Sequence, residues 1–235
     1  MKKGYILIVF VLDRSGSMQG IWDQTILGVN RYFDSQRHQS GDCHVTLAQF
    51  DDVYELIYNC VPIAHLAPRS RENYIPRNMT ALHDAMGRTI DEVGKQLAAL
   101  PEHERPERVL FVTQTDGLEN ASREYTAEIV RNKIEHQRQA YRWEFVFLGA
   151  NQDSILIARN LGISVNSTMT YAANDIGTLA AMDSLAIHTN SYRQGTAQAV
   201  NFTRGERLFQ ASVGAHADAA NDPNIDTPDD VAKSA

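Results

Sequence analysis

The sequence predicts an α/β fold: a doubly wound, mostly parallel central sheet with helices on both faces and one antiparallel edge hairpin. Three observations predict this fold class. Short apolar runs of strand length alternate with segments whose apolar residues recur every three or four positions. Several of these runs are unbroken, which is typical of strands buried on both faces of a sheet. Two further runs are separated only by Asp51-Asp52, which indicates a tight hairpin.

The first elements are a central strand and an amphipathic helix. The run over residues 5–12 is unbroken and rich in Ile and Val, so it predicts a strand in the middle of the sheet. Apolar residues then recur at spacings of four, three and four between Trp22 and Phe33. This spacing predicts a helix with one apolar stripe that ends before Ser40-Gly41.

The hairpin consists of the two strands predicted over residues 44–50 and 53–61. If the two aspartates between them form the turn, Cys43 lies opposite Cys60. The two sulfurs are then close enough for a disulfide in an oxidising compartment. Two reduced thiols are the favoured interpretation, because two cysteines are too few for a disulfide framework and fit a cytoplasmic protein.

The rest of the chain continues the alternation. Residues 62–79 hold three prolines and three arginines and predict a surface loop. Solvated side chains are the favoured interpretation of Arg69, Arg71 and Arg77, and pairing with an acidic partner is the alternative. A helix follows over residues 82–100 and ends at Pro101. By the same criteria, strands are predicted over 109–112, 143–148 and 163–171, and helices over 123–140, 153–161 and 175–190.

The C-terminal segment differs in composition from the rest. From Ala211 the chain is rich in Ala, Asp, Asn and Pro, and residues 211–235 carry five aspartates against one lysine. This segment therefore holds −4 of the net charge of −7. We expect a solvated, flexible acidic tail.

Composition and charge exclude several classes of protein. With 43% hydrophobic and 22% charged residues, the chain has the make-up of a soluble protein with a core. It holds no apolar stretch near the roughly 20 residues that span a bilayer. Its lysine-flanked start resembles a secretory signal, but Asp13-Arg14 stands where a cleavage site belongs. Basic residues do not cluster, so we expect no nucleic-acid partner.

The segment Asp13-Arg14-Ser15-Gly16-Ser17 directly follows the first strand. In an extended turn alternate side chains point the same way, so one carboxylate and two hydroxyls converge outside the carboxyl end of the strand. Open α/β sheets bind ligands at this edge. A donor set made only of oxygens suits a hard cation such as Mg²⁺, Mn²⁺ or Ca²⁺.

Two other polar positions belong with this segment. Asp116, with Gly117 behind it, also follows a buried strand, and Thr80 stands just before the helix that begins near Ala81. Each has a simpler interpretation, since Thr80 is a plausible helix N-cap and Asp116 a plausible turn residue.

Together, Asp13, Ser15, Ser17, Thr80 and Asp116-Gly117 resemble the metal-ion-dependent adhesion site of the von Willebrand factor A domain. The resemblance covers about residues 4–192, which leaves residues 193–235 as a C-terminal extension. It implies that these five side chains bind Mg²⁺, Mn²⁺ or Ca²⁺ and that an Asp or Glu of a protein partner completes the coordination. The segment Arg77-Asn78-Met79-Thr80 departs from the family's Gly-rich form of this loop.

Function is expected to follow the family, with two alternatives open. The resemblance implies a non-catalytic, cytoplasmic binding module of the bacterial or phage intracellular type, whose partner belongs to a larger ATPase or a particle. Neighbouring loops would shape the contact surface, with candidates at Gln19, Trp22, Asp51, Asp52, Glu119, Asn120, Asn151 and Asp153. The first alternative is a metal-assisted phosphoryl-transfer enzyme. Such enzymes usually carry a second carboxylate two residues after the first, and this chain has Ser15 there, which speaks against this alternative. The second is a structural protein of a viral or multi-subunit particle.

Overall fold

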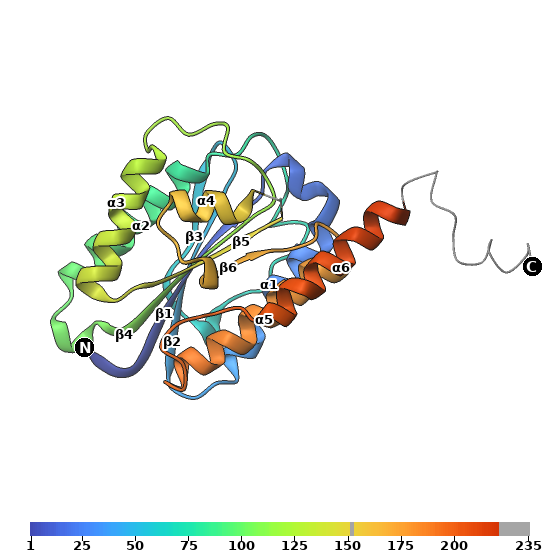
Figure 1. The fold of residues 1–235 in the computed structure, drawn as a ribbon. Coiled ribbons are helices and arrows are strands. Elements are labelled where there is room, and N and C mark those ends of the chain that lie inside the picture. Colours follow the sequence, from blue (N-terminus) through green and yellow to red (C-terminus); the bar gives the residue numbers. More distant parts are fainter. Residues whose placement is uncertain (151–152, 221–235) are drawn as a thin grey trace, which may run out of the picture.

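The computed structural model describes residues 1–150 and 153–220, and these form one six-stranded sheet with helices on both faces (Figure 1). The strands are β1 (Lys2–Asp13), β2 (Asp42–Phe50), β3 (Tyr54–Pro62), β4 (Pro106–Thr115), β5 (Glu144–Gly149) and β6 (Thr168–Thr170). The helices are α1 (Trp22–Arg37), α2 (Leu82–Ala99), α3 (Ala127–Tyr141), α4 (Ser154–Asn160), α5 (Asp175–Arg193) and α6 (Arg204–Ala220). The predicted fold class is confirmed.

Strand β1 lies in the middle of the sheet and has both faces buried. Ile6, Ile8 and Phe10 pack into the core on the side of α1 and α5, and the residues between them pack into the core on the side of α2, α3 and α4. Side chains alternate between faces along a strand, so an unbroken apolar run places apolar groups in both cores. Figure 1 shows α2 and α3 on one side of the sheet and α1 and α5 on the other.

The sheet order, β3-β2-β1-β4-β5-β6, determines where a ligand site can form. From β1 the chain builds outward to β2 and β3, and it then returns to the other side of β1 with β4. The strands β1 and β4 are therefore parallel neighbours whose connections leave in opposite directions. The crevice outside their carboxyl ends is the switch point at which open α/β sheets bind ligands.

The antiparallel hairpin is present, but its predicted register is wrong. The turn extends to Val53, since Phe50 pairs with Tyr54, and two irregularities shift the register further along the strands. Cys43 packs in the core beside α1 and α5, whereas Cys60 packs on the opposite face of the sheet. Both thiols are free, and Cys60 lies 3.4 Å from the Tyr5 hydroxyl.

Two other boundaries differ from the prediction. The last strand is limited to Thr168–Thr170 because a 3₁₀ turn over Val165–Ser167 takes up the residues before it. The tail expected from Ala211 begins with helix instead, since α6 continues to Ala220. Alanine is the strongest helix former, so an Ala-rich segment continues a helix that is already started. The remainder of the expected tail, residues 221–235, lies outside the described residues.

None of the described helices combines the length and the apolar character needed to cross a membrane.

Candidate metal centre

The first residue of the site, Asp13, ends β1 and is completely buried. One of its carboxylate oxygens accepts the backbone N–H of Ser15 at 2.6 Å, and the other accepts the hydroxyl of Thr115 at 2.5 Å. Its carbonyl oxygen accepts the hydroxyl of Tyr74 at 2.6 Å. Because Thr115 ends β4, groups from three separate segments hold Asp13 at the switch point.

The hydroxyls of Ser15 and Ser17 lie beside each other just beyond β1. A short 3₁₀ helix over Gly16–Ile21 begins directly after Ser15, so the segment is more tightly turned than the extended loop expected from the sequence. The two hydroxyl oxygens are 3.1 Å apart. Ser17 also donates a hydrogen bond of 2.6 Å to the carboxylate of Asp116, 99 residues away in the chain. The loops after β1 and β4 therefore meet through their site residues.

Thr80 is not the cap of α2, because the N-cap position belongs to Ala81. Its backbone is instead held by the loop after β4. The N–H of Thr80 donates to the side-chain carbonyl of Asn120 at 2.9 Å, and its carbonyl accepts the N–H groups of Asn120 and Ala121. The Thr80 hydroxyl is thus free of a capping role, and its position depends on the loop that carries Asp116.

Gly117 shows most directly that the hydroxyls converge. A Cβ atom placed on this glycine would lie 2.8 Å from the Thr80 hydroxyl oxygen, 3.1 Å from that of Ser17 and 3.4 Å from that of Ser15. Three hydroxyls from two loops thus surround one point beside Asp116. A side chain on residue 117 would occupy this point, so the close approach requires glycine.

Two carboxylates meet here in a largely buried setting. Burial raises the pKa of Asp13 to about 6, and the nearby charge of Asp116 adds to the rise, whereas hydrogen bonds from Thr115 and Ser15 oppose it. Burial also raises the pKa of Asp116, against the effect of its hydrogen bond from Ser17. Both carboxylates are thus costly to ionise without a cation beside them. Arg14 does not supply that cation, because it pairs with Asp51 and Glu55.

The donor set fits a hard divalent cation. Two carboxylates and three neutral hydroxyls are oxygen ligands of the kind that Mg²⁺, Mn²⁺ and Ca²⁺ take. Among the described residues, no group of three or more His, Cys, Asp and Glu side chains is arranged to hold a metal ion. A metal site at this edge of the sheet would therefore depend on the hydroxyls of Ser15, Ser17 and Thr80 as well as on the carboxylates.

Several residues expected to shape the contact surface have other roles. Asp51 is completely buried and pairs with Arg14 and Arg77, and the indole N–H of Trp22 donates to the carbonyl of Tyr74. Glu119 binds the first turn of α2, and Asn120 binds the backbone of Thr80. Gln19 and Asp52 are exposed, Asp153 occupies the N-cap of α4, and Asn151 lies outside the described residues.

The three arginines expected to be solvated all have partners within the chain. Arg69 is buried, with its guanidinium 2.9 Å from the Tyr58 hydroxyl, and Arg71 forms two hydrogen bonds with Asp23. Arg77 pairs with the buried Asp51 at 2.6 Å. The expectation of a solvated side chain is wrong for Arg69, which is buried. Arg71 and Arg77 are exposed, as expected, but each is paired with an aspartate of the chain.

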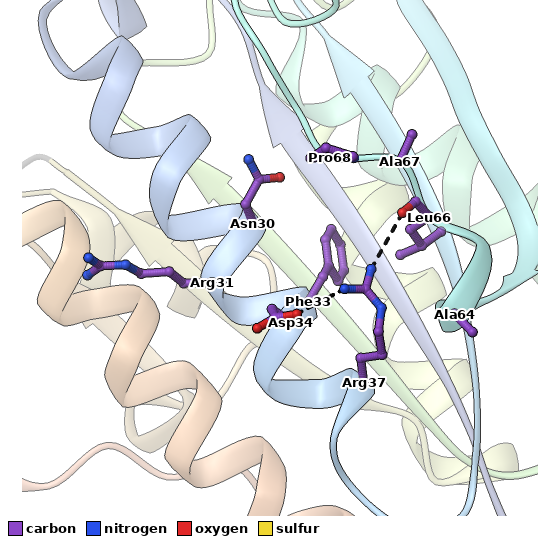
Figure 2. Close-up of a pocket in the computed structure, with 9 residues that line it drawn as sticks. All are labelled: Asn30, Arg31, Phe33, Asp34, Arg37, Ala64, Leu66, Ala67 and Pro68. Atoms are coloured by element: carbon purple, nitrogen blue, oxygen red, sulfur yellow. Dashed lines mark hydrogen bonds and ion pairs between the residues drawn. The ribbon is translucent and has the colours of Figure 1, made fainter.

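A hollow of about 630 Å³ lies away from this edge, between α1 and residues 64–68 (Figure 2). Its only acidic lining residue, Asp34, is bound by Arg37 at 3.0 Å. The Arg37 guanidinium also reaches the carbonyl oxygen of Leu66. Two of its three charged side chains, Asp34 and Arg37, are thus engaged with each other, and the hollow holds none of the five converging residues.

The fold places the chain among proteins with the von Willebrand factor A fold. Comparison of the sequence with protein-family models and with curated proteins gives no match. Solved structures do match: the von Willebrand factor domain of the pilus tip protein Mfa5 from Porphyromonas gingivalis aligns with a TM-score of 0.55 and 10% identity, over 79% of this chain and 95% of that one. The chain therefore has the von Willebrand factor A fold.

Two further structures with this fold contain metal. Proximal thread matrix protein 1 from the mussel byssus, with zinc in its metal-ion-dependent adhesion site, aligns with a TM-score of 0.53 and 16% identity over 80% of this chain. This chain spans 46% of the length of the mussel protein. The manganese-loaded TRAP protein of Plasmodium vivax aligns with a TM-score of 0.50 and 15% identity, over 76% of this chain and 73% of that one.

Proposed function

We propose that this chain is a protein-binding module that depends on a divalent metal ion, held by Asp13, Ser15, Ser17, Thr80 and Asp116. The observation that carries the proposal is the convergence of the three hydroxyls on the open point beside Gly117, next to the Asp116 carboxylate. The metal-containing structures with the same fold support it. We propose Mg²⁺ as the resident ion, because hydroxyl and carboxylate oxygens suit it.

The residues have separable roles in this proposal. The hydroxyls of Ser15, Ser17 and Thr80 bind the ion through neutral oxygens, so they add no negative charge to that of the two carboxylates. Asp13, which already accepts two hydrogen bonds, anchors the site from beneath. The bound ion would supply a positive centre with a free coordination position, to which an Asp or Glu of a partner protein binds. The partner's remaining surface would supply most of the specificity.

The biological setting is part of the proposal. We propose a cytoplasmic protein of bacterial or phage type, with residues 4–192 as the binding domain and residues 193–235 as an extension. Its partner would be a protein in a larger assembly, such as a ring-shaped ATPase or a particle. An enzyme finds less support, because the residue two positions after Asp13 is Ser15, where a metal-assisted phosphatase carries a second carboxylate.

Calorimetry with Mg²⁺ tests the metal site. The wild-type chain should bind one equivalent, and Asp13→Ala should abolish binding. Asp52→Ala is the matched control, because Asp52 is an exposed aspartate in the turn of the neighbouring hairpin. Mg²⁺ heat that persists in Asp13→Ala would contradict the proposed ligand set.

A pull-down in Mg²⁺, with elution by EDTA, tests the protein partner. A specific partner should elute from the wild-type chain and be absent from Asp13→Ala, and its binding should require one Asp or Glu of its own. A partner that stays bound in EDTA would show that the contact does not run through the metal. Turnover of a generic phosphoester that requires Asp13 would favour the enzyme instead.

A further inference from the structure

The loop between β4 and α3 is irregular, yet six successive backbone N–H groups in it are hydrogen-bonded. Every backbone N–H from residue 120 to residue 125 donates to an acceptor in residues 80–84 or to Glu119. Irregular loops usually leave such groups to water. Here side-chain carboxylates accept most of the N–H groups that backbone carbonyls would accept in a helix or sheet.

Glu119 uses both of its carboxylate oxygens. One accepts the N–H groups of Ala121 and Ser122 at 3.0 and 2.7 Å, within the loop itself. The other accepts the Ser122 hydroxyl at 2.7 Å and the N–H of His83 at 2.9 Å. The N–H of His83 belongs to the first turn of α2, where such groups lack a partner within the helix. Glu119 therefore ties the loop to the positive end of α2.

Asp84 makes the reciprocal connection from α2. Its carboxylate accepts three successive backbone N–H groups of the loop, those of Arg123 at 2.7 Å, Glu124 at 2.9 Å and Tyr125 at 2.7 Å. The N–H of Asp84 in turn donates to the Ser122 hydroxyl at 3.0 Å. We call Glu119, Asp84 and Ser122, with these contacts, the carboxylate clasp.

The clasp joins two segments that each carry a site residue. On one side it holds the start of α2, two residues after Thr80. On the other it holds the loop that begins at Asp116 and Gly117. Between them the backbone of Thr80 is bound by Asn120 and Ala121. The clasp and these contacts of Thr80 therefore together hold the Thr80 hydroxyl against the loop that carries Asp116.

From this geometry we infer that Glu119 and Asp84 are positioning residues of the metal site. They hold Thr80 and Asp116 in the arrangement that binds the ion, without touching the ion themselves. This inference rests on the proposed function. Coupling of this kind is reciprocal, so metal binding must in turn stabilise the clasp. Side chains that orient metal ligands typically contribute 10- to 100-fold to metal affinity.

The test measures affinity and local stability in the full chain. The probe is Mn²⁺ or Mg²⁺ alone, titrated by calorimetry at a temperature where each variant is folded. We expect Glu119→Ala and Asp84→Ala to weaken binding by about tenfold or more. Glu119→Gln keeps one accepting oxygen and should give an intermediate loss. The matched control is Glu92→Ala, because Glu92 is an α2 carboxylate bound to Tyr54 and Arg88, away from the loop.

Amide exchange supplies a readout that does not need the metal. In EDTA, the amides of residues 120–125 should be protected in the wild type and should exchange faster in Asp84→Ala. Metal should raise their protection in the wild type. If Glu119→Ala and Asp84→Ala lose stability but keep the wild-type Kd, their role is only structural and the inference is wrong.

The outcomes separate the two proposals. If the wild type binds metal through Asp13 and the clasp variants bind equally well, the inference fails and the proposed function stands. If the wild type binds no divalent metal, both fail. If binding falls in both clasp variants and not in Glu92→Ala, with the loop amides exposed, the clasp positions the site.

Discussion

The loops after β1 and β4 each carry one carboxylate of the candidate site, and they are held in different ways. The loop after β1 starts in the core: Asp13, the last residue of β1, is completely buried, and Arg14 is buried against Asp51. The loop after β4 lies nearer the surface, where Leu118 is 56% exposed. Its backbone N–H groups are bound by the carboxylates of Glu119 and Asp84. Substitutions near the loop after β1 should therefore act mainly on the folding free energy. Substitutions near the loop after β4 should act mainly on metal affinity.

The largest expected effect lies beside the first loop, at the buried aspartate of the hairpin turn. Asp51→Ala removes the carboxylate that lies 3.2 Å from Arg14 and 2.6 Å from Arg77. Arg14 is then buried beside only the partly exposed Glu55. Loss of one partner of a buried ion pair costs about 3–5 kcal/mol. Urea unfolding should show a loss of this order.

The control for Asp51→Ala is Asp23→Ala, which removes an equally close but exposed pair with Arg71. Exposed ion pairs contribute little because water and salt screen them. Equal losses from the two variants would contradict the expectation that the buried ion pair beside the loop after β1 contributes more to stability than an exposed pair.

The pH dependence of stability should single out Asp13. Burial raises its pKa to about 6, so in the metal-free protein its ionisation above this pH costs folding free energy. That cost is relieved as the pH falls from 7 toward the ordinary pKa near 4, and a rise of this size corresponds to at most about 3 kcal/mol. In EDTA, the stability of the wild type relative to Asp13→Asn should increase over this range.

Metal should reverse the sign of this pH effect. Carboxylate ligands must be ionised to bind an ion, so Mg²⁺ affinity should fall below pH 6. If the stability of the wild type relative to Asp13→Asn does not change between pH 7 and 4 in EDTA, folding does not raise the pKa of Asp13 and this prediction is wrong.

Added metal should stabilise the protein by binding at the point beside Gly117 on which the three hydroxyls converge. At about 100 times its Kd, Mg²⁺ should raise the free energy of unfolding by about 2.7 kcal/mol. Gly117→Ala should remove this gain, since its Cβ would lie 2.8 Å from the Thr80 hydroxyl. Gly20→Ala is the control, because a Cβ there meets no atom within 4 Å. Thermal unfolding with and without Mg²⁺ measures both, and an unchanged gain in Gly117→Ala would place the ion elsewhere.

The sequence predicts the parts of the fold that depend on local pattern. The unbroken run of β1 and the helical spacing of α1 and α2 each follow from the residues of one segment. The meeting of Asp13 and Asp116 also follows, because both residues stand at or just beyond the carboxyl ends of buried strands, here the neighbouring strands β1 and β4. For α6, a local signal was present: Thr203 and Glu206 form a capping box, with the Glu206 N–H bound to the Thr203 hydroxyl at 3.2 Å.

Contacts between distant side chains could not be predicted in this way. The hairpin register depends on two irregularities that no residue type between Asp42 and Pro62 specifies. The partners of Arg77 are set by how the loop before α2 folds onto the hairpin. The role of Asp84 is indicated only indirectly by the sequence. Ala81, the residue before α2, has no side chain that can cap the helix, so the first N–H groups of α2 need partners from another segment.

The smallest expected effect separates ordinary helix capping from the carboxylate clasp. Thr126 ends the loop after β4 and caps α3, with its hydroxyl accepting the N–H of Ile129 at 3.3 Å. Thr126→Ala should cost about 1 kcal/mol of folding free energy, as is usual for loss of an N-cap. It should leave the Kd for Mg²⁺ unchanged, because Thr126 contacts α3 and none of the residues that hold Thr80. Denaturant unfolding and calorimetry on this one variant test both expectations. A Kd that rises with the loss of this cap would mean that the whole loop, and not its clasped part, positions the metal site.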